Sequence, residues 1–244
     1  MIKIGYTKLN TENPKICVPL TPESIYSAIS QSHIIKEHAF DFVEFKADSF
    51  NGGANLSQLW NALMTISLQF QENPIIFSCR FSNLDSYFQT DRDYRDIITF
   101  AIRSGIPDAV EIDMDRDEQH IADAIDLALD TEVTPILFIA AAAGTTRQEI
   151  TAQLENAYNE DVEIYHLYRP VEKETDISDL TGIVDTFTSL HDGTTVICEP
   201  AGTIARNALA AGNAFHSPIV YASCQEQDSN TYIDADTLAS ILKK

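Results

Sequence analysis

Charged residues alternate with apolar ones in residues 41–48, Asp-Phe-Val-Glu-Phe-Lys-Ala-Asp. A period of two predicts a β-strand, with Val43 and Phe45 on one face and Glu44 and Lys46 on the other. An exposed sheet edge would show the same pattern. In a parallel sheet covered by helices, however, Glu44 and Lys46 would face the interior, where an unpaired charge is costly. The segment therefore predicts either a closed ion pair or a ligand site.

Three other side chains with useful chemistry, Arg80, His166 and Arg206, lie in or just after predicted strands. Two arginines and Lys46 that converge within an acidic protein would bind a carboxylate or a phosphate. The alternative is a structural network in which Glu44 pairs with Lys46 or Arg80. His166 is the candidate proton carrier, although a single histidine in a strand is more often a packing residue.

The segments that must position these side chains repeat as a strand followed by an amphipathic helix. This pattern predicts one α/β domain over residues 1–244, a single (β/α)8 TIM barrel with its site at the carboxyl ends of the strands. The eight predicted strands are residues 15–20, 41–48, 74–80, 108–114, 135–140, 162–168, 194–199 and 217–223.

The composition limits the classes of partner. The chain has 244 residues, with 37 acidic against 16 basic side chains and a net charge of −21. Nucleic acid and anionic membranes would repel such a protein. We find no apolar run long enough to span a bilayer and no signal peptide, so we expect a soluble cytoplasmic protein.

No motif indicates a metal or a cofactor. The four cysteines lack metal-ligand spacing, and we expect buried thiols. Asp113, Asp115 and Asp117 resemble the start of a calcium loop, but Glu118 and Ala124 occupy the positions that require glycine and glutamate. We expect Asp115 or Asp117 to cap a helix instead. The chain has no GxGxxG and no P-loop, so we expect no cofactor.

Taken in order, several segments resemble type I 3-dehydroquinate dehydratase, a lyase of the shikimate pathway of aromatic amino acid biosynthesis. Residues 43–50, Val-Glu-Phe-Lys-Ala-Asp-Ser-Phe, resemble the family's "VEWRVDxF" strand, and residues 75–80 resemble its "ILFTxR" strand. Residues 202–206 with 212–217 resemble "GxxSR…GxxFGS". Residues 14–20 and 104–113 add weaker matches. The resemblance implies a type I dehydroquinase barrel.

The resemblance also implies a mechanism. In this family a lysine on strand six forms an imine with the substrate ketone, and a histidine after strand five moves protons, oriented by a glutamate after strand three. Glu44, Arg80 and Arg206 match substrate-binding positions. Lys46 stands where the family has arginine, which keeps the charge but loses the planar guanidinium.

Other positions depart from the family. Residues 140–143 are alanines where the histidine is expected, and residues 81–85 lack its glutamate partner. Residues 162–168 contain no lysine. The C-terminal loop offers Asp228, Ser229 and Asn230 without a clear glutamine. Alanine cannot transfer a proton, and tyrosine cannot form a Schiff base.

Three hypotheses follow. The first is a family member that has lost the imine mechanism, a pseudoenzyme, and keeps a pocket for a quinate- or shikimate-like carboxylate formed by Glu44, Lys46, Arg80 and Arg206. The second is an active lyase or aldolase in which Lys46 forms the Schiff base and His166 or Tyr165 carries protons. The third is a working 3-dehydroquinate dehydratase. Glu44 would hold Lys46 protonated, which favours the first. The expected partners are a small carboxylate ligand or substrate and a second copy of the chain in a homodimer.

Overall fold

The computed structural model describes residues 1–51, 55–80, 90–225 and 232–243. Strands and helices alternate along the described chain from β3 to β10, and β11 follows β10 before α8. Contacts divide the chain into two compact units. Unit 1 contains Met1–Lys3, Lys8–Cys17 and Ile136–Lys244, and unit 2 contains Ile4–Thr7 and Val18–Pro135.

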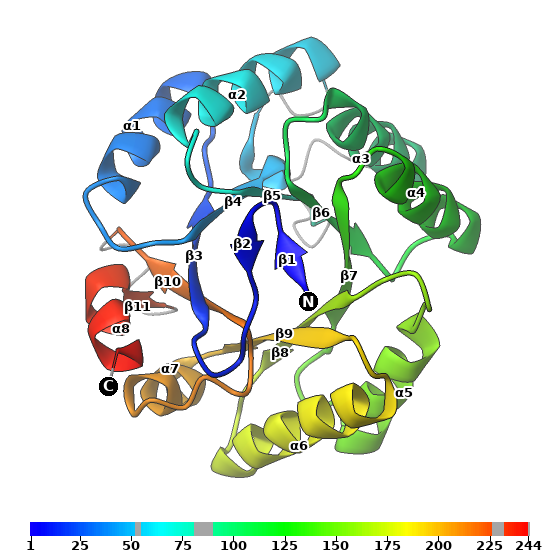
Figure 1. The fold of residues 1–244 in the computed structure, drawn as a ribbon, viewed down its shortest axis with the longest axis vertical. Helices are drawn as coiled ribbons and strands as arrows, with labels where there is room; N and C mark the ends of the chain where they lie inside the picture. The colour runs from blue at the N-terminus through cyan, green and yellow to red at the C-terminus, as the bar shows by residue number, and fades with distance from the viewer. Residues whose placement is uncertain (52–54, 81–89, 226–231, 244) are drawn as a thin grey trace. The chain divides into compact units, whose positions relative to one another are not determined.

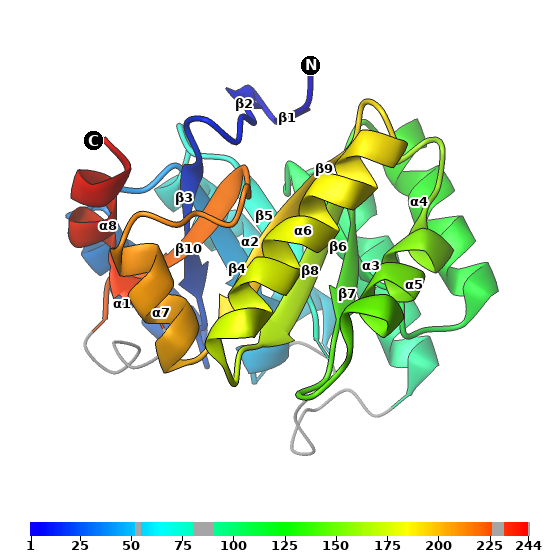
Figure 2. The same ribbon diagram turned by 90° about the horizontal axis from the view of Figure 1, so that it is seen from below.

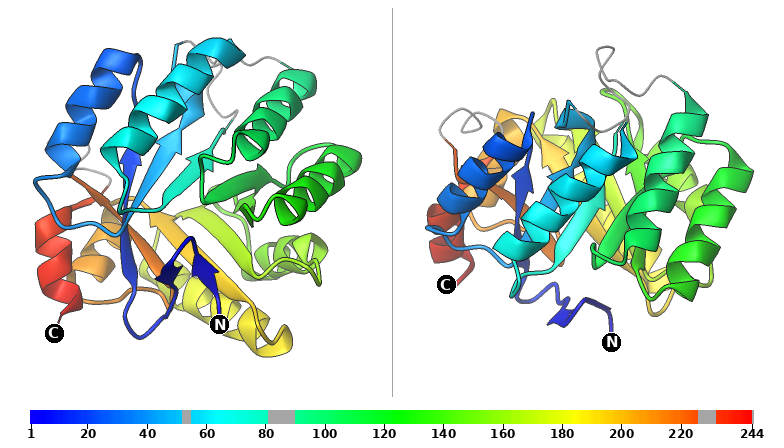
Figure 3. Two further views of the ribbon diagram at one scale, coloured as in Figure 1. Left: turned by 45° about the horizontal axis from the view of Figure 1, so that its top comes forward. Right: turned by 90° about the horizontal axis from the view of Figure 1, so that it is seen from above.

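Unit 2 contains three neighbouring parallel strands, β4 (Phe42–Lys46), β5 (Ile75–Ser78) and β6 (Ala109–Asp113). A short 3-10 helix, η1 (Ala47–Ser49), follows β4. Successive helices lie next to one another outside the strands (Figure 3). They are α1 (Ile25–Ile35), α2 (Leu56–Gln69), α3 (Asp91–Ser104) and α4 (Glu118–Asp130).

Strand β4 is buried on both of its faces. Phe42, Val43, Glu44 and Phe45 are all 0% exposed. The rings of Phe45 and Phe77 meet edge to face with centroids 5.8 Å apart, so the apolar face of β4 packs into the core. The alternation in residues 41–48 therefore belongs to an interior strand, and Glu44 lies on its buried polar face.

Unit 1 holds the later strands and helices (Figure 1). Strands β7 (Thr134–Ala140), β8 (Ile164–Pro170) and β9 (Thr195–Ala201) are neighbours in the sheet, and β8 pairs with both others in parallel. Strand β10 (Ile219–Ser223) pairs in parallel with β11 (Ile233–Asp234) and with residues 15–17 of β3 (Lys15–Leu20). Strands β9 and β10 also lie close together. Two further strands near the N-terminus, β1 (Lys3–Ile4) and β2 (Thr7–Lys8), form a separate sheet.

The helices of unit 1 are α5 (Arg147–Ala157), α6 (Glu174–Leu190), α7 (Thr203–Ala210) and α8 (Ala235–Leu242). Helix α6 contacts β9 and runs beside β8 and β9, and α7 also contacts β9 (Figure 2). Arg206 on α7 and Glu199 on β9 are thereby brought to one region of unit 1.

Local sequence signals explain where several elements begin. Thr146 and Glu149 form the predicted capping box of α5. Asp117 accepts hydrogen bonds from the backbone N–H groups of Gln119 and His120 and caps α4, which confirms the cap expected in place of a calcium loop. Strand β8, predicted as residues 162–168, begins at Ile164 and continues through Pro170.

Gly5 allows the turn between β1 and β2 to approach Asp108. Its φ is +55°, and a Cβ placed there would lie 2.6 Å from Oδ1 of Asp108. Asp108 cannot easily move away, because its Oδ2 accepts a 2.8 Å hydrogen bond from the backbone N–H of Ile75. The position therefore requires glycine for both conformation and space.

We expect Gly5→Ala to lower the free energy of unfolding by roughly 2 kcal/mol or more, because a left-handed conformation and a steric clash add together. Gly105→Ala is the matched control. Its φ is +62°, but a Cβ there meets nothing within 4 Å, so only the conformational cost of about 1 kcal/mol remains. Urea denaturation measures both variants, and equal losses would contradict the clash.

Candidate functional site

In unit 2 the predicted residues Glu44, Lys46 and Arg80 come together with a fourth, Glu111, in what we term the Arg80 cluster. Nη2 of Arg80 lies 3.3 Å from Oε1 of Glu44 and 2.9 Å from Oε2 of Glu111. Nε of Arg80 also donates to Oε2 of Glu111 over 3.2 Å. Nζ of Lys46 lies 3.6 Å from Oε2 of Glu44. The closed ion-pair network considered from the sequence is therefore present.

The two carboxylates of the Arg80 cluster are buried, whereas its two cations are partly exposed. The side chain of Glu44 is 0% exposed and that of Glu111 is 3% exposed, whereas Lys46 and Arg80 reach the surface with 16% and 14%. A buried carboxylate needs a counter-charge or hydrogen bonds. The two cations of the cluster thus balance its two carboxylates, and this balance reduces their attraction for a further anion.

Asp48 lies beside the Arg80 cluster, one residue into η1. Its Oδ1 accepts a 3.2 Å hydrogen bond from the backbone N–H of Arg80. Burial raises the pKa of the Asp48 carboxyl, and this effect outweighs the lowering by backbone hydrogen bonds and by the charges of Lys46 and Arg80. Through its hydrogen bond to the backbone of Arg80, Asp48 helps to hold the chain in place just after β5.

Sequence reasoning missed Glu111 as a site residue, although a signal was present. Glu111 lies between Val110 and Ile112 in the predicted fourth strand, just as Glu44 lies between Val43 and Phe45 in the second. A carboxylate flanked by apolar residues in an interior strand indicates a partner on a neighbouring strand. Here that partner is Arg80.

In unit 1 the predicted residue His166 lies next to Glu199, a carboxylate that was not predicted as a site residue. Nε2 of His166 is 3.1 Å from Oε2 of Glu199, and both side chains are buried. The imidazole stacks on Tyr221 with ring centroids 5.4 Å apart and meets Phe138 edge to face. Aromatic packing and Glu199 together fix the imidazole in place.

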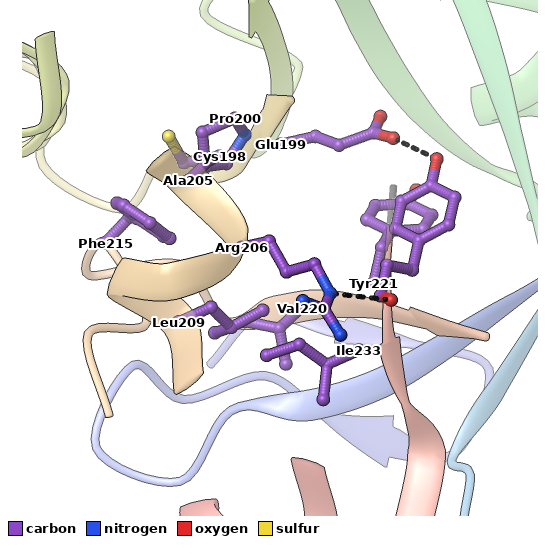
Figure 4. A pocket seen from close by; sticks show the side chains of 11 residues that line it. Cys198, Glu199, Pro200, Ala205, Arg206, Leu209, Phe215, Val220, Tyr221 and Ile233 are labelled. Atoms are coloured by element: carbon purple, nitrogen blue, oxygen red, sulfur yellow. Dashed lines mark hydrogen bonds between the residues drawn. The ribbon is translucent and has the colours of Figure 1, made fainter. Parts of the chain in front are cut away.

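Glu199 also contacts Tyr232, the residue just before β11. The Tyr232 hydroxyl donates a 2.8 Å hydrogen bond to Oε1 of Glu199 (Figure 4). Strand pairing places Tyr168 opposite Glu199 and His166 opposite Ile197. Cross-strand partners share a face of the sheet, so Glu199 and His166 point to the same side.

Arg206 lies on α7, and its side chain extends away from the helix (Figure 4). Its Nε donates to the backbone carbonyl of Tyr232 over 3.4 Å. No ion pair is found for Arg206 within the described residues, in contrast to Arg80. Arg206 is therefore the predicted cation that is best placed to meet an external carboxylate.

A small pocket brings these groups together in unit 1. Its volume is about 30 Å³, room for about two water molecules. Glu199, Arg206 and Tyr232 supply its polar lining. His166 is outside the lining and contacts two residues that belong to it, Glu199 and Tyr221. The other lining residues are Cys198, Pro200, Ala205, Leu209, Phe215, Val220, Tyr221 and Ile233.

The cysteines show no feature of a reactive site. Cys17, Cys79 and Cys198 are buried, as expected, whereas Cys224 is only half-buried, because it follows the end of β10. Burial raises the pKa of the Cys198 thiol to about 12, with a further contribution from Glu199, so this thiol stays protonated at neutral pH. Within the described residues, no group of three His, Cys, Asp or Glu side chains could hold a metal ion.

Residues 81–85 and 228–230, which depart from the family pattern, lie outside the described residues. The other two departures noted in the sequence lie on described residues. Strand β7 ends at Ala140 and is followed by Ala141, and β8 reads Ile-Tyr-His-Leu-Tyr-Arg-Pro. His166 thus occupies the interior of a strand that has no lysine.

These features describe an α/β protein with buried acidic and basic side chains on parallel strands. The family model for type I 3-dehydroquinase matches residues 16–244. The chain belongs to the type I 3-dehydroquinase family. This membership confirms the resemblance read from residues 43–50, 75–80 and 202–217.

Relatives and solved structures are similar along almost the whole chain. The 3-dehydroquinate dehydratase of Syntrophotalea carbinolica is 21% identical over 243 residues, covering 99% of this chain and 96% of that protein. The enzyme of Listeria welshimeri is 22% identical over 231 residues, covering 94% and 91%.

The crystal structure of type I 3-dehydroquinate dehydratase from Clostridium difficile, with covalently modified comenic acid, has a TM-score of 0.87 at 16% identity and covers 99% of this chain and 96% of that one. The Enterococcus faecalis structure has a TM-score of 0.85 at 15% identity, with coverages of 100% and 98%. The predicted fold class, an α/β (β/α)8 barrel of the type I dehydroquinase kind, is therefore confirmed. In the part of the chain that the structure describes, no helix has the length and apolar character needed to cross a membrane.

Proposed function

We propose that this protein binds a small carboxylic acid of the quinate or shikimate kind and does so without forming an imine. The observation that carries the proposal is the pairing of Lys46, the lysine among the predicted site residues, with Glu44. Their charged atoms are 3.6 Å apart, and Glu44 is fully buried. A carboxylate at this distance favours the ammonium form of Lys46, which has no lone pair to attack a ketone.

The ends of two strands support the proposal. In the family pattern, strand six supplies the imine lysine and the segment after strand five supplies a histidine. Here β8 contains His166 and no lysine, and β7 leads into residues 140–143, which are all alanine. An alanine run leaves no group that could move a proton at that position.

Arg206 is the group to which we assign the ligand carboxylate. The guanidinium lines the pocket of unit 1 beside the apolar side chains of Leu209 and Val220, and the volume of about 30 Å³ admits the carboxylate group of such a ligand and not its ring. Guanidinium and carboxylate form strong charge-assisted hydrogen bonds. Relatives are named 3-dehydroquinate dehydratase, and the Clostridium difficile structure contains modified comenic acid, which is also a carboxylic acid.

Calorimetric titration with quinate, shikimate and 3-dehydroquinate tests the binding. We expect at least one of them to bind, and Arg206→Ala to weaken that binding by about 10- to 100-fold, the effect of losing a charged hydrogen bond. Arg147→Ala removes an exposed arginine of the same unit and should leave the affinity unchanged. Equal affinities of the two variants, or no binding of any acid, would contradict the proposal.

Two alternative functions give different results in a trapping experiment. An active lyase or aldolase that uses Lys46 would retain a mass adduct on Lys46 after borohydride reduction with a keto acid. A working 3-dehydroquinate dehydratase with an imine mechanism would dehydrate 3-dehydroquinate and leave an adduct on another lysine. We expect the protein mass to remain unchanged with 3-dehydroquinate.

A further inference from the structure

Helix α2 carries apolar side chains on two of its faces. Four of them are buried in unit 2, namely Leu59, Ala62, Leu63 and Ile66. Four others recur at every fourth position, so they form one stripe along the helix, and they are between 36% and 62% exposed. These four are Leu56, Trp60, Met64 and Leu68. A helix that is apolar on more than one face normally has a packing partner on each of them.

Helix α1 lies beside α2 and enlarges this apolar surface (Figure 1). Its Tyr26 is 86% exposed and its Ile34 is 38% exposed. On the side of α3, the ring of Trp60 meets that of Phe100 edge to face with centroids 6.3 Å apart, which orients the indole. We term the six exposed apolar residues of α1 and α2 the α1–α2 face.

The α1–α2 face is uncharged in a strongly acidic protein. Neither helix contains Asp, Glu, Lys or Arg, although the whole chain has 37 acidic and 16 basic side chains. Other exposed helix surfaces carry acids, for example Asp123, Asp126 and Asp130 on α4. A basic partner would find no carboxylate on α1 or α2 to pair with. Two copies of a chain with a net charge of −21 repel each other, and this repulsion is smallest where two uncharged surfaces meet.

We propose that the α1–α2 face is the surface through which two copies of this chain associate. A fully exposed large side chain has an area of about 200 Å², so the six residues present roughly 600 Å² on each copy. Two such faces bury roughly 1,200 Å² together, which reaches the size of specific interfaces before the polar residues between them are counted. An apolar surface of this extent is at the upper limit for a monomer.

A two-fold axis suits this contact, because the same residues then meet on both sides of the interface. Side chains at every fourth position form a ridge along α2, and such a ridge packs into the groove of a second helix with the same spacing. The α1–α2 face lies in unit 2 and the proposed ligand pocket lies in unit 1. The inference therefore adds a partner to the protein and does not depend on the ligand.

The test measures association of the whole chain by sedimentation velocity and by fluorescence, from about 1 µM to about 500 µM protein. Trp60 is the one tryptophan of the chain, so its emission reports on this face alone. We expect a dimer to form within this range and the emission of Trp60 to shift to shorter wavelength in step with it. Added NaCl should increase the dimer fraction, because salt screens the repulsion between two acidic chains.

Leu68→Glu is the variant that tests the surface, and Leu190→Glu is its matched control. The two leucines are 62% and 66% exposed, and Leu190 ends α6 in unit 1. Both substitutions change the net charge equally. Leu68→Glu should weaken the dimer by at least about 10-fold, because a two-fold interface contains the added charge twice. Leu190→Glu should leave the dissociation constant unchanged.

Three results would overturn the inference. They are a monomer at every concentration, a dimer that leaves the emission of Trp60 unchanged, and equal effects of Leu68→Glu and Leu190→Glu. Circular dichroism checks that both variants fold. Because the emission of Trp60 is followed in the wild type, the inference stays testable if Leu68→Glu fails to fold. Calorimetric binding of an acid at Arg206 is a separate measurement, so either proposal can fail while the other stands.

Discussion

Replacing Arg80 with leucine is expected to lower the free energy of unfolding by roughly 3–5 kcal/mol. The variant leaves Glu44 and Glu111 buried without their shared guanidinium, and only Lys46 remains 3.6 Å from Glu44. Charge repulsion between the two carboxylates would add to the cost of burying them. Urea denaturation followed by circular dichroism measures the change.

Two further variants distinguish the loss of the buried ion pairs of Arg80 from the loss of any arginine. Arg92→Leu removes a side chain that is 81% exposed and pairs with Asp96 at the surface, so it should cost less than about 1 kcal/mol. Adding Glu111→Gln to Arg80→Leu should recover part of the lost stability, because one buried charge is removed. If Arg80→Leu is as stable as Arg92→Leu, the buried network contributes little.

Asp176→Ala is the variant with the second large expected effect. We expect it to lower the free energy of unfolding by roughly 3–5 kcal/mol. Oδ1 of Asp176 lies 3.1 Å from Nη2 of Arg169, which is 4% exposed, and Oδ2 accepts the backbone N–H groups of Glu172 and Lys173 before α6. The variant would leave a buried guanidinium without its carboxylate and remove a helix cap. Glu174→Ala, an exposed acid in the same first turn, should cost less than about 1 kcal/mol.

The Asp176 contribution should also depend on pH. Burial raises the pKa of Asp176, but the backbone hydrogen bonds and the charges of Arg169 and Lys173 outweigh it and lower the pKa below the ordinary 3.8. A lowered pKa in the folded state means that the stabilisation is complete above the pKa of the unfolded chain. The stabilisation is lost as the pH falls through the lower pKa that Asp176 has in the folded state.

Comparison of the wild type with Asp176→Asn checks this sign. The difference in unfolding free energy should be constant from pH 7 to about pH 5 and should shrink as the solution is acidified further. Denaturant titrations at several pH values measure it. A difference that stays constant down to about pH 2 would show that the charge of Asp176 does not contribute.

Much of the fold followed from local patterns. The alternation in residues 41–48 and the apolar residues of 75–78 predicted strands that the structure contains, and Thr146 and Asp117 were recognised as helix caps. Such signals depend on neighbours in the sequence, so one chain suffices to read them. The predicted ends of the strands were less accurate than their positions in the chain. For example, β8 continues through Pro170, because strand pairing with β9 extends that far.

The candidate site was only partly predictable, for a different reason. Glu44 and Lys46 share one strand face, and their ion pair could be anticipated from a spacing of two residues. Glu111 is 31 residues from Arg80, and Tyr232 is 33 residues from Glu199. No short-range pattern connects residues at such separations, so these partners were missed.

The sequence by itself determined the strand and helix order, the family resemblance, the acidic character and the absence of a lysine from residues 162–168. Tertiary structure alone decided that Arg80 lies between Glu44 and Glu111 and that His166 lies against Glu199 and Tyr221, two residues of the pocket lining. The physical reason is that residue type and periodicity fix local conformation. The environment of a charge depends instead on which distant segments the packed strands bring within hydrogen-bonding distance.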